Sequence, residues 1–318
     1  MKTKVILSIV SLFLIISSSC YESKQKPDDF DEFWQSSLKE LDNNLVYDIV
    51  KDTIIKEKKV SLIAIKSYKE VTIYSWVSIP EKPGKFPVFI SFFGFGRGKA
   101  SGKELPSKWF LSQKNRINMV VDIRGQGLSK DQIKFKGYLT NGLENRNNYI
   151  YRGAYLDAVK AVDYAKTLLN GDGNIIAMGG SQGGALAVAA TALNPNVTMC
   201  IASFPFLTDM HNYEKDKWPM KIWIHDTKIK RRKLEDLHET LSYFDVLNFA
   251  EKVDVPFLLR TQETDIVTPK EGAIKLFNAV KSNNKNLYIA PCSGHGCSSK
   301  SSFANKIEQI FIEENLKK

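Results

Sequence analysis

The residue best placed to do chemistry in this 318-residue chain is a serine set among glycines. Residues 179–183 read Gly-Gly-Ser-Gln-Gly and match G-x-S-x-G, a pattern that puts a serine on a sharp turn between a strand and a helix with its hydroxyl exposed. An apolar run at 174–178 precedes the turn, and small residues at 184–187 follow it. We therefore predict that Ser181 is a nucleophile, with Gly179 and Gly183 standing where a Cβ would clash. An ordinary glycine turn is the alternative.

A serine hydroxyl needs a general base, and the base needs an orienting acid; proteins with this turn supply them in the order Ser, acid, His. Among four histidines, only His295 follows the last strand-like run at 286–290, in a Ser-Gly-His-Gly turn. Asp265 follows the preceding strand-like run and is the predicted acid, with Glu263 as its rival. The remaining histidines fall in a segment expected to form a cap: His211, His225 and His238.

Ester cleavage also needs two backbone N–H donors for the negative charge that develops on the attacked oxygen. One comes from the residue after the nucleophile, which is Gln182. The loop after the first parallel strand, Gly94-Phe95-Gly96, is expected to supply the other through Phe95, although it could be only a glycine-rich turn.

The elements that must position these residues follow an alternating pattern. Continuous apolar runs indicate strands buried on both faces, and helix-period stretches separate them, which predicts an α/β fold with a mostly parallel sheet flanked by helices. A helix at 28–41, two or three antiparallel strands within 59–79 and a cap at 206–245 over the carboxyl edge of the sheet complete the expected domain, 27–318. The predicted strands are 87–93, 118–122, 174–178, 199–204, 255–261 and 286–290, and the helices 149–169, 182–193, 269–281 and 301–315.

The first twenty residues are typical of an export signal. Lys2 and Lys4 precede a short apolar run at 5–16, and serines lead to Cys20. The run is too short for a resident membrane helix. We expect Cys20 to be lipidated in a bacterial cell envelope and 21–26 to be a polar tether, with plain secretion as the alternative.

Charge and cysteine content narrow the function classes. The net charge is +10, but the cations are spread along the chain without interleaved aromatic residues, which argues against nucleic-acid binding. The run 228–233 is interpreted as a solvated helical face. A zinc site around Cys292 and Cys297 lacks a second ligand pair, and a local disulfide is a further alternative; we interpret these two and Cys200 as buried thiols.

Together these residues resemble the acetyl xylan esterase and cephalosporin-C deacetylase family, carbohydrate esterase family 7 of the α/β-hydrolase superfamily. The resemblance spans about residues 25–312 and implies a Ser181, Asp265, His295 triad, removal of acetyl groups from small or sugar-borne esters, no metal or other cofactor, and often a hexamer. It also implies that Arg124 and Gln126 brace the nucleophile turn. The matching segments are PDDFDEFW (27–34), DIRGQGLS (122–129), GY (137–138), YRGAYLDAV (151–159), GSQGG (180–184), YFDV (243–246), TDIVTP (264–269) and GH (294–295).

The chain departs from the family pattern in two segments. The family usually has His-Gly-Tyr where this chain has Phe93-Gly94-Phe95, and Glu where Gly296 follows the histidine. The predicted function is a serine esterase that removes acetyl groups through an acyl-enzyme. A peptidase or thioesterase with the same triad, and a non-catalytic glycan-binding lipoprotein, are the alternatives.

Overall fold

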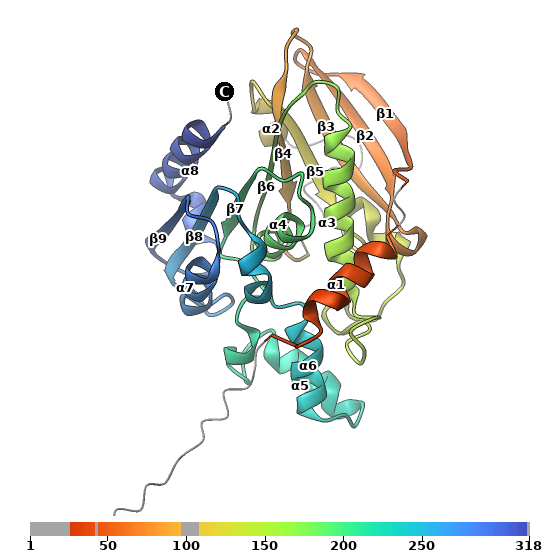
Figure 1. The fold of residues 1–318 in the computed structure, drawn as a ribbon, viewed down its shortest axis with the longest axis vertical. Coiled ribbons are helices and arrows are strands. Elements are labelled where there is room, and N and C mark those ends of the chain that lie inside the picture. The colour runs from red at the N-terminus through yellow and green to blue at the C-terminus, as the bar shows by residue number, and fades with distance from the viewer. Residues whose placement is uncertain (1–25, 42–43, 97–107, 317–318) are drawn as a thin grey trace, which may run out of the picture.

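The computed structural model describes residues 26–41, 44–96 and 108–316, and within them nine strands form one sheet (Figure 1). Its strand order is β1-β2-β3-β5-β4-β6-β7-β8-β9. The strands from β5 to β9 are parallel to one another, whereas β1, β2 and β3 are antiparallel, which confirms the predicted α/β architecture. The bounds are β1 Tyr47–Ile54, β2 Lys58–Lys66, β3 Thr72–Pro80, β4 Phe86–Phe92, β5 Ile117–Asp122, β6 Gly171–Gly180, β7 Met199–Ser203, β8 Phe257–Thr264 and β9 Lys285–Ser293.

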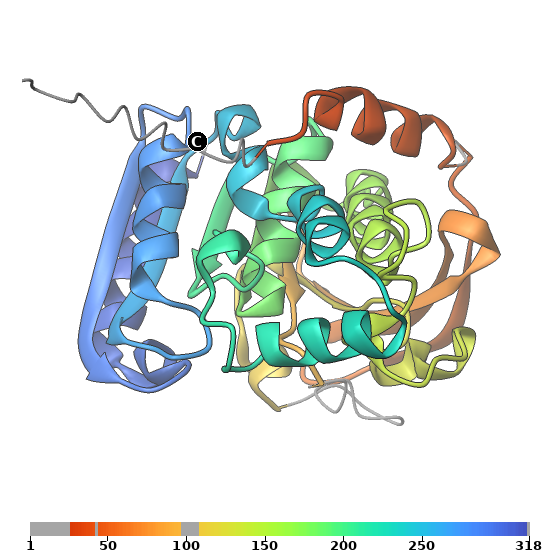
Figure 2. The ribbon, with the colours of Figure 1, turned by 90° about the horizontal axis from the view of Figure 1, so that it is seen from below.

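Helices cover both faces of the sheet because its central strands are apolar on both sides (Figure 2). Along β4, Val88 and Ile90 join the large core on one face, while Phe89 joins a smaller cluster on the other. The large core includes side chains of α1 Phe30–Lys39, α3 Ile150–Lys166, α4 Gln182–Leu193 and α7 Lys270–Ala279. On the opposite face lie α2 Lys108–Ser112 and α8 Ser302–Asn315.

The cap segment contains two further helices, α5 Met220–Ile229 and α6 Leu234–Ser242, which lie together at one end of the molecule (Figure 1). Trp223 of α5 is fully buried, and its indole N–H donates to the carbonyl of Leu139 at 2.9 Å. The basic run 228–233 spans the end of α5 and the turn into α6, where its side chains are mostly exposed. Lys230 pairs there with Asp226 and Glu144.

The edge strand β1 was not predicted. Its side chains are almost all exposed, including Tyr47, Ile49 and Ile54, so neither face of the strand is buried and no alternation of apolar and polar residues is required. A bulge between Ile49 and Lys51 disturbs the period further. Pairing with β2 holds this strand in place, and that pairing leaves no local pattern in the sequence.

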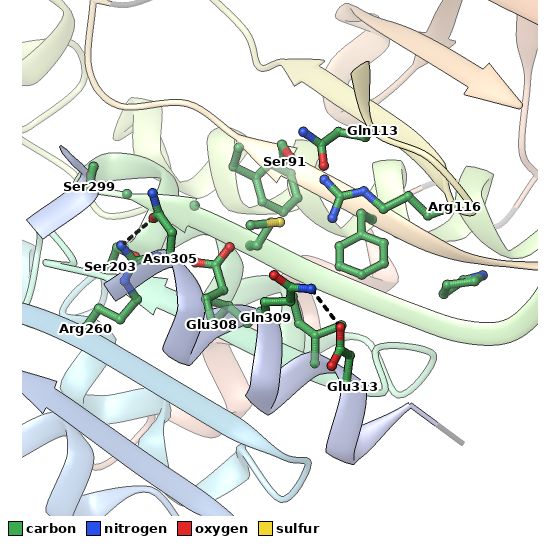
Figure 3. A pocket seen from close by; sticks show the side chains of 18 of the residues that line it. Ser91, Gln113, Arg116, Ser203, Arg260, Ser299, Asn305, Glu308, Gln309 and Glu313 are labelled. Carbon is green, nitrogen blue, oxygen red and sulfur yellow. Dashed lines mark hydrogen bonds and ion pairs between the residues drawn. The ribbon is translucent and has the colours of Figure 1, made fainter. Parts of the chain in front are cut away.

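A groove of about 910 Å³ opens on the face of the sheet that carries α2 and α8 (Figure 3). Phe89 and Ile201 contribute apolar side chains to its lining, and Arg116, Glu308 and Gln309 contribute polar ones. Ser181, Asp265 and His295 are not among its lining residues. We therefore assign the groove no part in the chemistry.

Candidate active site

Ser181 lies on the turn between β6 and α4 in a backbone conformation that L-residues rarely adopt, with φ 56° and ψ −124°. A residue keeps such a strained conformation only when contacts with the surrounding structure hold it there. Here the Ser181 N–H donates to the carbonyl of Ser203 at 2.9 Å, and the Ser181 carbonyl accepts from Phe206 N–H at 3.0 Å. A Cβ at Gly179 would lie 2.6 Å from the carbonyl oxygen of Phe92, and one at Gly183 only 2.0 Å from it. Glycine at both positions therefore allows the turn to press against the end of β4.

Adjacent parallel strands deliver the predicted base and acid to the same edge of the sheet. Asp265 follows β8 directly, His295 lies two residues beyond β9, and Thr264 pairs with Ser293 in the register of the two strands. His295 Nδ1 lies 2.8 Å from Asp265 Oδ2, and His295 Nε2 lies 3.0 Å from Ser181 Oγ. The three side chains thus form a continuous hydrogen-bonded chain, although they are far apart in the sequence.

The surroundings of Asp265 stabilise its charged form. Burial by itself would raise the pKa of this carboxyl, but hydrogen bonds from His295, the Thr268 hydroxyl and the Val267 N–H outweigh burial and lower the pKa to about 2. Gln262 also donates to Asp265 Oδ2. The rival acid, Glu263, is exposed and pairs with Lys270, so it is not the partner of His295.

The residues expected to supply the two N–H donors, Gln182 and Phe95, follow Ser181 and Gly94 in the chain. Gln182 is the first residue of α4, so its N–H has no acceptor within the helix and lies at the positive end of the helix dipole. A Cβ at Gly94 would lie 3.6 Å from Ser181 Cβ, which brings the loop after β4 against the turn. Phe95 directs its ring toward the aromatic side chains of Tyr138 and Trp218, with centroid distances of 5.7 and 6.2 Å.

The two predicted bracing residues have different contacts. Gln126 Nε2 donates to Gln182 Oε1 at 3.1 Å, and the Tyr151 hydroxyl donates to the same oxygen at 2.9 Å, so Gln126 supports the turn directly. Arg124 instead binds Asp157 of α3 through Nε and Nη2, both at 2.8 Å. The attraction of Asp157 raises the pKa of Arg124 against the lowering effect of burial. Arg124 therefore anchors its loop to α3, and its side-chain hydrogen bonds go to Asp157 and to the carbonyl of Tyr68.

Phe204 is a further residue at the site, and the sequence did not point to it. Its ring packs edge-on against the His295 imidazole with 5.2 Å between centroids. A Cβ at Gly180 would lie 2.8 Å from this ring, and one at Gly296 would lie 3.5 Å from it. The φ of Phe204 is 37°, a strained value for a bulky residue. Phe204 therefore fills the space that two glycines leave open beside the base.

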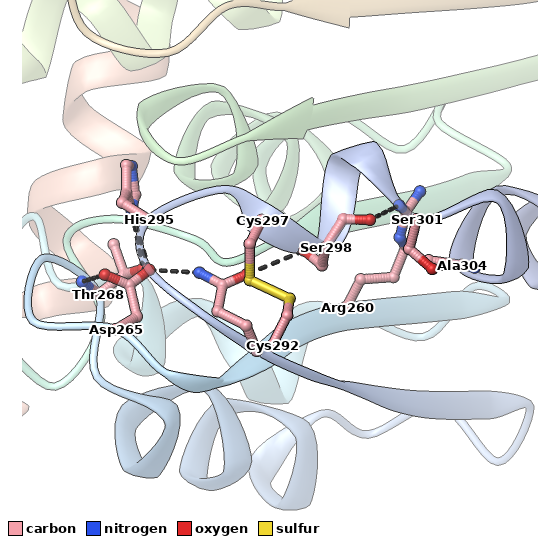
Figure 4. The surroundings of a disulfide bond; sticks show 10 residues. Arg260, Asp265, Thr268, Cys292, His295, Cys297, Ser298, Ser301 and Ala304 are labelled. Atoms are coloured by element: carbon pink, nitrogen blue, oxygen red, sulfur yellow. Dashed lines mark hydrogen bonds and ion pairs between the residues drawn. A yellow bond between two sulfur atoms is a disulfide. The ribbon is translucent and has the colours of Figure 1, made fainter.

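The interpretation of Cys292 and Cys297 as buried thiols was wrong, because they form a disulfide (Figure 4). Both are only partly buried, and the fold brings the end of β9 to the start of the 3-10 helix Cys297–Lys300. Cys200 is a free buried thiol, as expected. Beside the disulfide, the Ser298 hydroxyl donates to Gln262 Oε1 at 2.9 Å.

Two features are absent from the part of the chain that the structure describes. No three His, Cys, Asp or Glu side chains come together there in a way that could hold a metal ion. Nor does any helix between residues 26 and 316, outside the two gaps, combine the length and apolar character needed to cross a bilayer. The predicted signal, tether and lipidation residue, Cys20, lie almost wholly outside the described residues.

Comparisons with known proteins agree with the geometry. The family model Acetyl xylan esterase (AXE1) matches residues 17–312. Acetyl esterase Axe7A of Xylanibacter ruminicola is 30% identical over 314 residues, covering 92% of this chain and 68% of the relative. The crystal structure of acetyl xylan esterase 1 from Thermoanaerobacterium sp. superposes with a TM-score of 0.79 at 23% identity, over 91% of this chain and 94% of the other. The structure of acetyl xylan esterase from Paenibacillus sp. R4 superposes with a TM-score of 0.76 at 25% identity, over 92% of this chain and 96% of the other. The chain therefore belongs to the acetyl xylan esterase family and is a serine esterase of the α/β-hydrolase fold that removes acetyl groups.

Proposed function

We propose that the natural substrate is an acetylated carbohydrate and that Ser181, His295 and Asp265 perform the hydrolysis. The observation that carries the assignment of roles is the pair of contacts made by His295, 3.0 Å to Ser181 Oγ and 2.8 Å to Asp265 Oδ2. Relatives named as acetyl xylan esterases support the substrate class. A peptidase or thioesterase is not favoured by these comparisons.

The reaction begins with attack of Ser181 Oγ on the acetyl carbonyl carbon. An ionised carboxylate can only accept hydrogen bonds, so Asp265 holds the proton of His295 on Nδ1 and leaves the lone pair of Nε2 facing the serine hydroxyl. Nε2 takes the serine proton as the new C–O bond forms. The backbone N–H groups of Gln182 and Phe95 stabilise the oxyanion, a type of contact worth about 10²–10³ in kcat per donor.

The imidazolium then donates its proton to the departing sugar hydroxyl, and an acetyl-serine remains. Water attacks this ester with His295 again accepting a proton, and acetate leaves as the Ser181 hydroxyl is restored. The carboxylate of Asp265 stabilises the imidazolium in both halves of the reaction.

The assignment is tested by measuring acetate released from acetylated xylo-oligosaccharides by the wild type and by Ser181→Ala. We expect the variant to lose about 10⁴-fold or more in kcat, as loss of a serine nucleophile does elsewhere, with an unchanged circular dichroism spectrum. A peptide amide and an acyl thioester serve as comparison substrates. Acetate release that survives in Ser181→Ala, or faster turnover of the amide or thioester, would contradict the proposal.

The cellular location is part of the same proposal. We propose that residues 1–20 direct export, that Cys20 carries a lipid, and that residues 21–26 connect the anchor to an enzyme domain, 27–318. The order of basic, apolar and small residues before Cys20 supports the proposal. Cys20→Ala should move the enzyme from the membrane fraction to the soluble fraction; retention on the membrane would refute lipidation. The hexamer implied by the family remains a prediction, which light scattering of the purified protein would measure.

A further inference from the structure

The loop that carries His295 has little intrinsic preference for one shape. Gly294 and Gly296 flank the histidine with φ values of 99° and 74°, a region that glycine enters freely. Apart from its two chain neighbours, no residue that the structure describes has an atom within 4 Å of where a Cβ of Gly294 would stand, so no group packs against that side of the residue. The imidazole nevertheless has to point at both Ser181 and Asp265. Contacts beyond the local backbone must therefore hold it.

The disulfide supplies one such contact. It joins residues five apart in sequence, Cys292 and Cys297, and so closes a small ring that contains His295 and both flanking glycines. Within the ring, Cys297 N–H donates to the Gly294 carbonyl at 3.2 Å. A second hydrogen bond, from Gly294 N–H to the Thr264 carbonyl at 2.8 Å, ties the ring to the end of β8. Closing the ring restricts the backbone angles that the two glycines would otherwise explore.

The same ring is tied to the acid of the triad. Cys297 is followed by Ser298, whose fully buried hydroxyl donates to Gln262, and Gln262 donates to Asp265 (Figure 4). Arg260 Nη2 also donates to the carbonyl of Ser298 at 3.2 Å. One end of the ring is thus anchored beside the acid, and the disulfide extends that anchor to the end of β9. Opening the disulfide would loosen the base while leaving every triad residue in the chain.

We propose that the Cys292–Cys297 disulfide is a positioning element for the general base, so that kcat depends on its oxidation state. The inference rests on the proposed role of His295. Cys292 and Cys297 are both only partly buried, so we expect a dithiol to reduce their disulfide, whereas Cys200 is buried. Reduction transfers two electrons and two protons from the dithiol: the S–S bond breaks, two thiols form, and the dithiol closes to its own disulfide.

The test reduces the folded wild-type enzyme with dithiothreitol, counts alkylated thiols by mass spectrometry, and measures kcat and KM with p-nitrophenyl acetate. Because a misplacement of about 1 Å can cost about a hundredfold in rate, we expect a loosened base to lower kcat about tenfold. KM should stay within about twofold, the circular dichroism spectrum should not change, and reoxidation should restore kcat. The paired variant Cys292→Ser and Cys297→Ser should show the same loss and no response to dithiothreitol.

Cys200→Ala is the matched control and should keep the full response to reduction. Unchanged kcat in enzyme with both new thiols alkylated would overturn the proposal. A fall in kcat accompanied by loss of ellipticity at the assay temperature would also overturn it, because the disulfide would then be stabilising the whole fold. Should the paired variant not fold, reduced wild type measured at low temperature decides between these results. Inactivity of the oxidised enzyme would instead refute the proposed function, which separates the two failures.

Discussion

Replacing Asp265 by asparagine keeps the shape of the triad acid but removes its charge and turns one acceptor oxygen into an NH₂ donor. Asp265 Oδ1 accepts from Val267 N–H at 2.8 Å and from Thr268 N–H at 3.2 Å, while Oδ2 accepts from His295 Nδ1 at 2.8 Å. An asparagine at 265 can place its side-chain oxygen at the Oδ1 position, where it still accepts from the N–H groups of Val267 and Thr268. Its NH₂ group then faces His295 Nδ1, and that nitrogen must become an acceptor.

The altered hydrogen bond moves the imidazole proton to Nε2, which faces Ser181 Oγ and can no longer accept the serine proton. In the best-studied triad this change lowers kcat about 10⁴-fold, which corresponds to about 5.5 kcal/mol. We expect a similar loss for Asp265→Asn with p-nitrophenyl acetate at pH 7.5, together with a KM close to that of the wild type.

Stability should change as well, by an amount that the pKa indicates. The carboxyl has a pKa of about 2 in the folded protein against an ordinary value of 3.8, and at ~1.4 kcal/mol per unit the folded site favours the carboxylate by ~2 kcal/mol. Asp265→Asn should lower the free energy of unfolding at pH 6 by about this amount. Glu263→Gln is the matched control, since Glu263 is exposed and pairs with Lys270 rather than with His295. The kcat of this variant should differ from that of the wild type by less than about twofold. The reasoning is refuted if Asp265→Asn keeps kcat within tenfold of the wild type, or if Glu263→Gln loses as much.

Two further outcomes follow from the same contacts. Because the pKa of Asp265 is lower in the folded than in the unfolded protein, the contribution of its charge to the free energy of unfolding is complete above about pH 4 and disappears as the pH falls toward 2. The difference between wild type and Asp265→Asn in free energy of unfolding, measured with urea, should therefore shrink over that range. A constant difference would contradict the assignment. Phe204→Leu removes the ring that packs on His295 and abuts Gly180, so kcat should fall about tenfold and stability by ~1–2 kcal/mol, as measured by steady-state kinetics and thermal melting; an unchanged kcat would show that Phe204 does not orient the base.

Much of the fold was readable from local patterns. The helix predicted at 182–193 is α4 with the same bounds, and the predicted parallel strands overlap those observed, because continuous apolar runs and helix-period runs each leave a signature within a few residues. Ser181 was identifiable for the same reason, since a strained turn of this kind requires glycines at fixed offsets.

The sequence by itself therefore determined the nucleophile turn, the positions of the parallel strands along the chain, and the candidates for base and acid. Tertiary structure decided which of them meet. The choice of Asp265 over Glu263 depends on which carboxylate the fold brings to His295, and the disulfide depends on β9 and the following turn closing on themselves. Phe204 reaches His295 only because β7 lies beside β6 and β8 in the sheet. The contacts of Asp265 and Phe204 with His295 join residues far apart in sequence, so their energies leave no mark in local periodicity or spacing.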